Sequence, residues 1–256
     1  MMLNCDLGEG FGAWTMPVDE QIMVYIDQAN IACGFHAGDP LVLQNAIGLA
    51  KRHNVAVGAH PSYPDLQGFG RRSMNMAADE LKACLLYQIS ALWGMAKCQG
   101  VELAYVKPHG ALYNDLMKNA EVRNTVMEAV AEFSEARLPL MIQAHPRYPE
   151  LQQQANTLGL VLWFEAFVDR RYTDDGYLMS RRLEGAVLSF EQAIGQAVRM
   201  LNRQEVVTES GNVLQLPIDT LCVHGDSPDA VGMAAELRKI MTKAKLGQAP
   251  SGNTAL

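Results

Sequence analysis

Residues 103–114 read L-A-Y-V-K-P-H-G-A-L-Y-N, a short apolar run that ends in a cluster of polar side chains. Short apolar runs with β-branched or aromatic residues are typical of buried parallel strands. The same order, an apolar run and then a polar cluster, recurs along the chain. The other runs are residues 3–7, 26–35, 55–59, 138–144, 158–166 and 218–223. The sequence therefore predicts about seven strands, nearly all with polar residues at the carboxyl end.

Segments with helical spacing of apolar residues separate these runs. Asp39-Pro40, Ser189 and Ser227-Pro228 suit helix starts, because Asp and Ser accept unpaired backbone N–H groups and Pro tolerates the first turn. The helical segments are residues 40–53, 77–98, 120–136, 147–157, 189–204 and 227–243, and residues 205–217 alternate like a hairpin. Strand and helix in alternation predict a mostly parallel sheet with right-handed crossovers.

Such a sheet is either open or closed into a barrel. An open doubly wound sheet binds its ligand at one switch point, mainly with two or three strands. A barrel brings the ends of all its strands to one mouth. Polar clusters at nearly every strand end favour the barrel, so we expect an α/β fold, a TIM-barrel-like (β/α) barrel of about seven parallel strands. We expect one domain over residues 1–244 and a flexible tail over residues 245–256, which are rich in Gly, Ser, Pro and Asn.

The composition limits the class of protein. The 256 residues are 49% apolar, which suffices for a large single core, and the net charge of −7 argues against nucleic acid or an anionic membrane as partner. The five cysteines form no C-x-x-C pair, and no run reaches the roughly 18 apolar residues of a membrane span. We expect a reduced, cytoplasmic protein that acts on a small molecule or another protein.

Histidines and aspartates gather at the predicted strand ends, which favours one polar pocket over independent packing positions. Converging histidines and carboxylates can transfer protons or hold a divalent metal. No H-E-x-x-H motif decides between these uses, so both stay open. The residues are His36, His60, His109, His145 and His224, with Asp6, Asp39, Asp65, Asp169 and Asp226 beside them.

Two glycine-rich loops and one lysine suggest an anionic ligand. The loops G-E-G-F-G at 8–12 and Q-G-F-G-R-R at 67–72 can present backbone N–H groups and arginines to a carboxylate or phosphate, although ordinary turns and a solvated arginine pair would look the same. Neither loop is a P-loop. Lys107 ends an apolar strand run, and we expect its ammonium group to point into the mouth of the barrel.

Six motifs, in this order, resemble the LamB/YcsF family over about residues 2–240. They are LNCDLGEGFG (3–12), NIACGFHAGDP (30–40), GAHPSYPDLQGFGRR (58–72), VKPHGALYN (106–114), FEAFVDRRYTDDGYL (164–178) and CVHGDSP (222–228). The resemblance implies a seven-stranded barrel of the glycoside hydrolase/deacetylase type. It also implies a hydrolase subunit that, with partner subunits B and C, opens 5-oxo-L-proline to L-glutamate with ATP and Mg²⁺.

On the positions that match these motifs we expect two groups of residues. Proton transfer and charge stabilisation would fall to Asp6, His60, Lys107, His109, Asp169, His224 and Asp226. Substrate or phosphate binding would fall to Asn4, Glu9, Asn30, His36, Asp39, Arg72 and Arg170. A protein-bound metal and a homo-oligomer stay open. The alternatives are a metal-dependent amidohydrolase or deacetylase and a non-catalytic subunit that binds 5-oxoproline.

Overall fold

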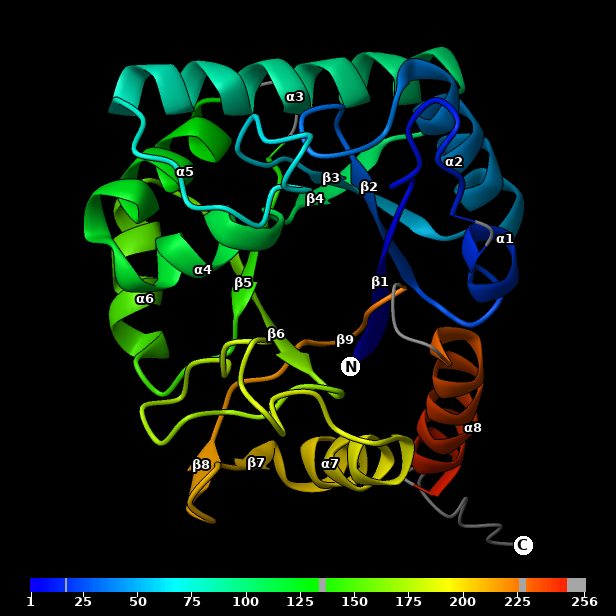
Figure 1. Ribbon diagram of the computed structural model, residues 1–256, viewed down its shortest axis with the longest axis vertical. Coiled ribbons are helices and arrows are strands. Elements are labelled where there is room, and N and C mark those ends of the chain that lie inside the picture. The colour runs from blue at the N-terminus through cyan, green and yellow to red at the C-terminus, as the bar shows by residue number, and fades with distance from the viewer. Residues whose placement is uncertain (17, 134–136, 226–228, 248–256) are drawn as a thin grey trace, which may run out of the picture.

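The computed structural model describes residues 1–16, 18–133, 137–225 and 229–247. Within these residues, seven parallel strands close into a barrel that helices surround (Figure 1). In their order around the barrel, the strands are β1 (Met2–Leu7), β2 (Gln28–Ala32), β3 (Ala56–His60), β4 (Leu103–Val106), β5 (Leu140–Gln143), β6 (Leu162–Phe167) and β9 (Thr220–Val223). The predicted (β/α) barrel is confirmed.

The last strand closes the barrel. Strand β9 pairs in parallel with β1 on one side and with β6 on the other, so the sheet has no free edge. The hairpin predicted within residues 205–217 is present as β7 (Glu205–Val207) and β8 (Val213–Gln215), an antiparallel pair outside the barrel. It lies beside α7 (Phe190–Arg203) on the outside of the barrel (Figure 1).

The helices follow the predicted alternation, with two additions. In the described chain they are α1 (Val18–Ile22), α2 (Pro40–His53), α3 (Ala78–Cys98), α4 (Gly110–Lys118), α5 (Ala120–Glu132), α6 (Tyr148–Thr157), α7 and α8 (Ala230–Gly247). The sequence analysis did not predict α1 or α4. Helix α8 continues to Gly247, so three residues of the predicted tail are helical, and residues 248–256 lie outside the described chain.

Two predicted caps form as expected. The Asp39 carboxylate accepts the backbone N–H groups of Leu41 and Val42 at 2.9 and 3.1 Å, and Pro40 begins α2. The Ser189 hydroxyl accepts the backbone N–H of Gln192 at 3.3 Å, and the side chain of Gln192 accepts the backbone N–H of Ser189 at 3.1 Å. Both caps pair N–H groups that a helix cannot bond internally. The predicted start at Ser227-Pro228 lies outside the described residues.

The interior of the barrel is polar. The Tyr105 hydroxyl of β4 donates to Asn30 Oδ1 of β2 at 2.6 Å, and Asn4 Nδ2 donates to Thr220 Oγ1 at 3.0 Å. Gly58 of β3 provides the space for this packing, because a Cβ there would lie 2.2 Å from the Tyr105 ring. Hydrogen-bonded side chains therefore fill the barrel beneath its mouth.

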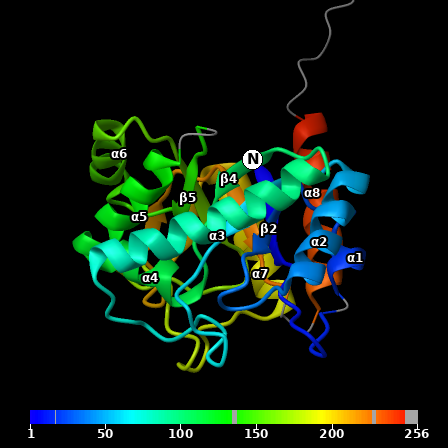
Figure 2. The ribbon, with the colours of Figure 1, turned by 90° about the horizontal axis from the view of Figure 1, so that it is seen from above.

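The seven strands of the barrel all run in the same direction, so their carboxyl ends lie on one face of the barrel. Figure 2 shows the amino terminus on one side of the barrel and the loops after β3 and β6 projecting from the opposite side. Catalytic residues of such barrels come from these loops and strand ends. Among the described residues, no helix combines the length and apolar composition that crossing a bilayer requires. All five cysteines are free thiols.

Candidate active site

A cavity of about 560 Å³ opens at the carboxyl ends of the strands. Its volume lies in the range of small-molecule sites. The lining comes from the ends of β1, β3, β4, β6 and β9 and from the loops that follow them. It includes Asp6, His60, Lys107, His109, Arg170 and His224, which the sequence predicted for one mouth.

Lys107 lies at the floor of this cavity, oriented as expected. Its Nζ lies 2.8 Å from Asp6 Oδ1 and 2.8 Å from Glu165 Oε1. Burial alone would lower the pKa of Lys107, but Asp6, with Cys222 and Glu165, raises it well above its ordinary value. Burial would likewise raise the pKa of Asp6, but Lys107, with His60, holds it well below its usual range. The floor thus places an ammonium group between the ionised Asp6 and the carboxyl group of Glu165.

The predicted substrate ligands Asn4 and Asn30 do not line the cavity. They are fully buried beneath Asp6 in the barrel. Asn30 Nδ2 donates to Asp6 Oδ1 at 2.8 Å and to Asn4 Oδ1 at 2.8 Å. This corrects the prediction, because the two asparagines orient the Asp6 carboxylate toward Lys107 instead of meeting a ligand.

Glu165 is a site residue that the sequence analysis missed. Its side chain is fully buried, and besides Lys107 it bonds to Tyr113, whose hydroxyl donates to Glu165 Oε2 at 2.7 Å. A signal was present, since Glu165 stands between Phe164 and Ala166 in an otherwise apolar strand. A buried carboxylate needs a paired charge, and only the fold shows that this charge comes from the lysine that follows β4.

His224 on the cavity wall pairs with Asp169. His224 Nδ1 lies 2.9 Å from Asp169 Oδ2, and the imidazole stacks on the Phe167 ring at 5.3 Å between centroids. Burial would raise the pKa of Asp169, but His224 lowers it below its ordinary value, so the carboxylate is ionised and accepts the Nδ1–H. A base oriented by a carboxylate is the usual arrangement for proton abstraction. Asp226, predicted beside them, lies outside the described residues.

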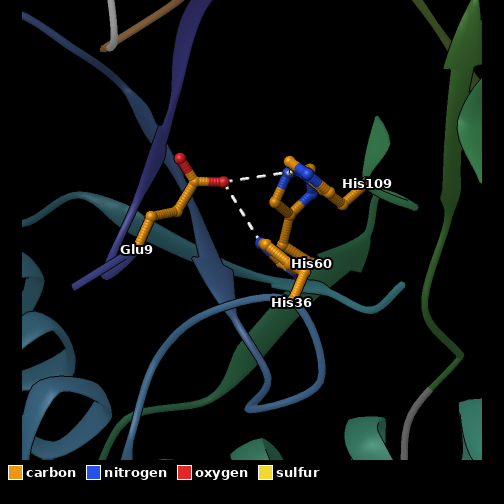
Figure 3. A group of neighbouring side chains, drawn as sticks. All are labelled: Glu9, His36, His60 and His109. Carbon is orange, nitrogen blue, oxygen red and sulfur yellow. Dashed lines mark hydrogen bonds and ion pairs between the residues drawn. The ribbon is translucent and has the colours of Figure 1, made fainter. Parts of the chain in front are cut away.

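A third cluster joins Glu9, His36, His60 and His109 (Figure 3). Glu9 Oε1 lies 3.2 Å from His36 Nε2 and 3.3 Å from His109 Nδ1, and His109 Nδ1 lies 3.0 Å from His60 Nε2. The rings of His36 and His109 stack at 3.7 Å between centroids. Burial lowers the pKa of both rings well below the ordinary value, which favours their neutral forms. Imidazole and carboxylate groups in this arrangement are suited to hold a metal ion.

The loop that carries Glu9 is held by carboxylates. The Gly8 N–H donates to Asp19 Oδ2 at 2.9 Å, and the Gly12 N–H donates to Asp39 Oδ2 at 2.7 Å. Gly8 has a φ of +67°, a conformation that favours glycine. These two N–H groups are therefore not available to an external anion, and the loop positions Glu9.

Asp19 makes folding pH-dependent. Burial raises its pKa from 3.8 to about 6. A raised acid pKa means that the stability contribution is complete below the unfolded pKa and is lost as the pH rises through 6. D19N removes the ionisation, so we expect it to raise the free energy of unfolding by about 1–3 kcal/mol at pH 7.5, with a gain that shrinks toward pH 4. Urea unfolding at the two pH values measures this, and the exposed neighbour variant E20Q is the control. An equal gain at both pH values would contradict the assignment.

Four further predicted residues, Arg72, Asp65, Asp39 and His145, lie apart from the cavity and from the third cluster. Arg72, with 61% of its side chain exposed, pairs with Asp65, and its Nε donates to Asp65 Oδ1 at 3.0 Å. Asp39 is occupied as the cap of α2. His145 packs against Tyr177, with 4.6 Å between ring centroids, and does not line the cavity. These placements correct the predicted set, because a strand-end position does not decide the direction of a side chain in a loop.

The remaining lining is strongly cationic. Burial, together with Arg181, lowers the pKa of Arg170 to about 10, which still leaves it charged at neutral pH. Arginines in a concave site are suited to bind carboxylate or phosphate oxygens. Sequence analysis singled out Arg72, whereas the structure brings its neighbour to the cavity, together with cations from distant segments. The lining cations are Arg71, Lys107, Lys118, Arg170, Arg181 and Arg182.

Comparisons with known proteins agree on one family. The family model described as "LamB/YcsF family" matches residues 1–255. The A subunit of 5-oxoprolinase from Chromohalobacter salexigens is 47% identical over 238 residues, covering 93% of this chain and 95% of that protein. The A subunit of 5-oxoprolinase from Vibrio cholerae is 49% identical over 239 residues, covering 93% and 96%. The crystal structure of the "Lactam Utilization Protein" from Thermus thermophilus superposes with a TM-score of 0.87 at 38% identity, covering 96% of this chain and 97% of that chain.

Proposed function

This chain belongs to the LamB/YcsF family, and from that premise we propose that it is the A subunit of an ATP-dependent 5-oxoprolinase, which opens 5-oxo-L-proline to L-glutamate. The names of relatives that match over nearly their whole length support the substrate. The observation that carries the proposal is the cationic cavity with Lys107 held between two carboxylates at its floor.

The proposed substrate explains why a cationic cavity is needed. 5-Oxoproline is an unactivated lactam that carries a carboxylate. Transfer of a phosphoryl group from ATP to the lactam oxygen would release ADP and make the ring carbon electrophilic. Water then attacks this carbon, and the C–N bond breaks as the ring nitrogen takes a proton, which leaves the acyl phosphate of glutamate. A second water molecule hydrolyses this acyl phosphate to glutamate and inorganic phosphate. Both the phosphorylated oxygen and the substrate carboxylate are anions that a positive site stabilises.

We assign the proposed roles in binding and charge stabilisation from the positions of the cations in the cavity. Arg71 and Arg170 line the wall, where paired N–H donors suit the substrate carboxylate. Lys107 at the floor supplies fixed positive charge for the lactam oxygen as it is phosphorylated. Its ion pairs with Asp6 and Glu165 hold the ammonium group in place before substrate arrives.

His224 is the proposed base for the attacking water. Its Nδ1–H is held by Asp169, so the other ring nitrogen carries the lone pair that accepts a proton. His60 and His109 line another part of the same cavity. Mg²⁺ enters as the companion of ATP, and partner subunits B and C complete the proposed enzyme.

Coupled release of ADP and glutamate tests the proposal. We expect equal amounts of both from 5-oxoproline and Mg-ATP when this chain is combined with B and C subunits, and neither product when ATP or any one of the three chains is omitted. Chelator-sensitive lactam cleavage by this chain alone, without ATP, would instead support the metal-dependent amidohydrolase. Full turnover by a complex in which this chain lacks Lys107 and His224 would support the non-catalytic binding role.

A further inference from the structure

The Glu9 cluster contains histidines whose protonated nitrogens are determined by their partners. His60 Nδ1 lies 2.7 Å from the carbonyl oxygen of Lys107, and His109 Nε2 lies 2.8 Å from the carbonyl oxygen of Phe69. A carbonyl oxygen only accepts hydrogen bonds. Both nitrogens therefore donate, and in the neutral rings the other nitrogen of each, His60 Nε2 and His109 Nδ1, carries a lone pair. His60 Nε2 also lies 3.5 Å from Asp6 Oδ1, so a second carboxylate borders the cluster.

The third histidine is held in the same way. His36 Nδ1 lies 3.0 Å from Ser62 Oγ, and the Ser62 hydroxyl donates its single hydrogen to the Tyr63 carbonyl oxygen at 2.9 Å. Ser62 Oγ therefore accepts from His36 Nδ1–H. The neutral His36 ring has its lone pair on Nε2, which faces Glu9.

The acceptor nitrogens of these rings and the Glu9 carboxylate lie close together, and one of the parallel rings of His36 and His109 must turn for both to bind one ion. His60 Nε2 and His109 Nδ1 are 3.0 Å apart, and Glu9 Oε1 lies 3.2 Å from His36 Nε2 and 3.3 Å from His109 Nδ1. All four ligand atoms lie within 4.8 Å of one another. Acceptor atoms at these distances repel one another, and a positive charge placed among them would remove this repulsion.

We propose that Glu9, His36, His60 and His109 bind a divalent transition-metal ion of the Zn²⁺ class. Zn²⁺ takes imidazole nitrogen and carboxylate oxygen at about 2.0–2.2 Å in tetrahedral geometry, for which neighbouring ligand atoms are roughly 3.3 Å apart. The three separations given above, 3.0, 3.2 and 3.3 Å, are close to this spacing. The outward N–H of each histidine donates to an oxygen, as is usual for metal-binding histidines.

The neighbouring group of Asp6, Cys222 and His224 shows the contrast. Its potential ligand atoms also lie within 4.8 Å of one another. Lys107 Nζ already lies 2.8 Å from Asp6 Oδ1 and 3.4 Å from Cys222 Sγ, so a side chain supplies the cation there. The Glu9 cluster offers imidazole nitrogens and a carboxylate oxygen, which are metal ligands, and the positive charge of Arg71 acts on its His36.

The metal site would form part of the cavity wall, because His60 and His109 line the cavity. Metal binding by this chain does not depend on which substrate the cavity takes. It therefore remains testable if the proposed 5-oxoprolinase activity proves wrong.

Metal binding to the full chain tests the site. Protein stripped with a chelator is titrated with Zn²⁺, and separately with Co²⁺ as a spectroscopic probe. We expect one ion per chain, a Co²⁺ absorption spectrum typical of tetrahedral nitrogen and oxygen ligands, and a higher melting temperature with metal. We expect the near-isosteric variant E9Q and the double variant H36Q/H109Q to weaken binding at least about 100-fold. The matched controls are H53Q and H145Q, two histidines outside the cluster.

The supporting variant S62A changes no ligand. It removes the acceptor of His36 Nδ1–H, and we expect it to weaken Zn²⁺ binding about 10-fold or more. The proposal is overturned if the folded wild-type chain takes up no ion, or if E9Q and H36Q/H109Q, shown by circular dichroism to be folded, bind the ion as wild type does. Nitrogen NMR that finds an imidazolium among His36, His60 and His109 in chain equilibrated with Zn²⁺ would also overturn it, since a proton would then occupy the site.

Discussion

Replacing Lys107 by methionine is expected to lower 5-oxoproline turnover by the assembled enzyme at least about 100-fold, the loss that follows removal of one charge stabiliser of a transition state. Methionine keeps the length and apolar body of the side chain but not its charge. The lactam oxygen would then meet a floor that contains the carboxylates of Asp6 and Glu165 without their cation. The measurement is ADP and glutamate release at saturating substrate, after gel filtration has verified that the complex assembles.

The same change also affects folding, and this must be separated from catalysis. Breaking a buried ion pair by removal of one partner costs about 3–5 kcal/mol. We expect K107M to lose free energy of unfolding of this order, and the double variant E165Q/K107M to recover part of it, since one of the two carboxylates left behind is removed. Turnover should stay low in both variants.

Lys118 provides the matched control for charge in the cavity. It lines the same cavity but is exposed. We expect K118M to reduce turnover by less than about 10-fold, because exposed charges are screened by solvent. Wild-type rates in K107M, or recovery of turnover together with stability in E165Q/K107M, would remove Lys107 from the proposed mechanism.

Replacing Gly110 by alanine is expected to destabilise the chain by about 3 kcal/mol or more and to disrupt the cavity, since strained backbone and overpacking both destabilise. Gly110 has a φ of +57°, and a Cβ on it would lie 2.5 Å from the Gly70 carbonyl oxygen. The left-handed conformation alone costs an alanine roughly 1–2 kcal/mol. The contact with backbone adds to this cost, because the Ala111 N–H already donates to the same oxygen at 2.8 Å. His109 directly precedes the substitution, so turnover should fall as well.

Gly159 separates strain from the steric contact. Its φ is +65°, but a Cβ there would meet nothing within 4 Å. G159A should therefore cost only about 1–2 kcal/mol. Urea unfolding of G110A and G159A measures the difference. Equal losses in free energy of unfolding would contradict a steric cost from the close approach of Gly110 to Gly70.

Local patterns predicted the barrel because its elements follow from short-range periodicity. The run L-A-Y-V at 103–106 became β4, and Pro40 and Ser189 mark where two helices begin or are capped. Polar clusters after the strands indicated closure, since only a barrel brings so many strand ends together. The pattern missed α4, whose first residues belong to the polar cluster after β4.

Side-chain direction was the main source of error at the site. Arg71 and Arg72 are adjacent arginines that the sequence pattern does not distinguish. Arg71 lines the cavity, whereas Arg72 pairs with Asp65 on the surface. Asn4 and Asn30, predicted as substrate ligands, lie on the neighbouring strands β1 and β2 but face the barrel interior beneath the mouth. Successive side chains of a strand point to opposite faces, and the direction of a side chain in a loop depends on the loop conformation. The local sequence pattern does not predict either direction at the end of a strand.

The order of residues by itself determined that this chain alternates strand and helix, closes a barrel, and carries histidines, carboxylates and a lysine to one rim. These features depend on hydrophobic period and on polar residues placed at strand ends, which are properties of short segments. Only the tertiary structure decided that Glu165 pairs with Lys107, that Asp169 orients His224, and that three histidines gather beside Glu9. Such pairings join atoms from different strands, and their energies depend on distances of a few ångströms that packing alone sets.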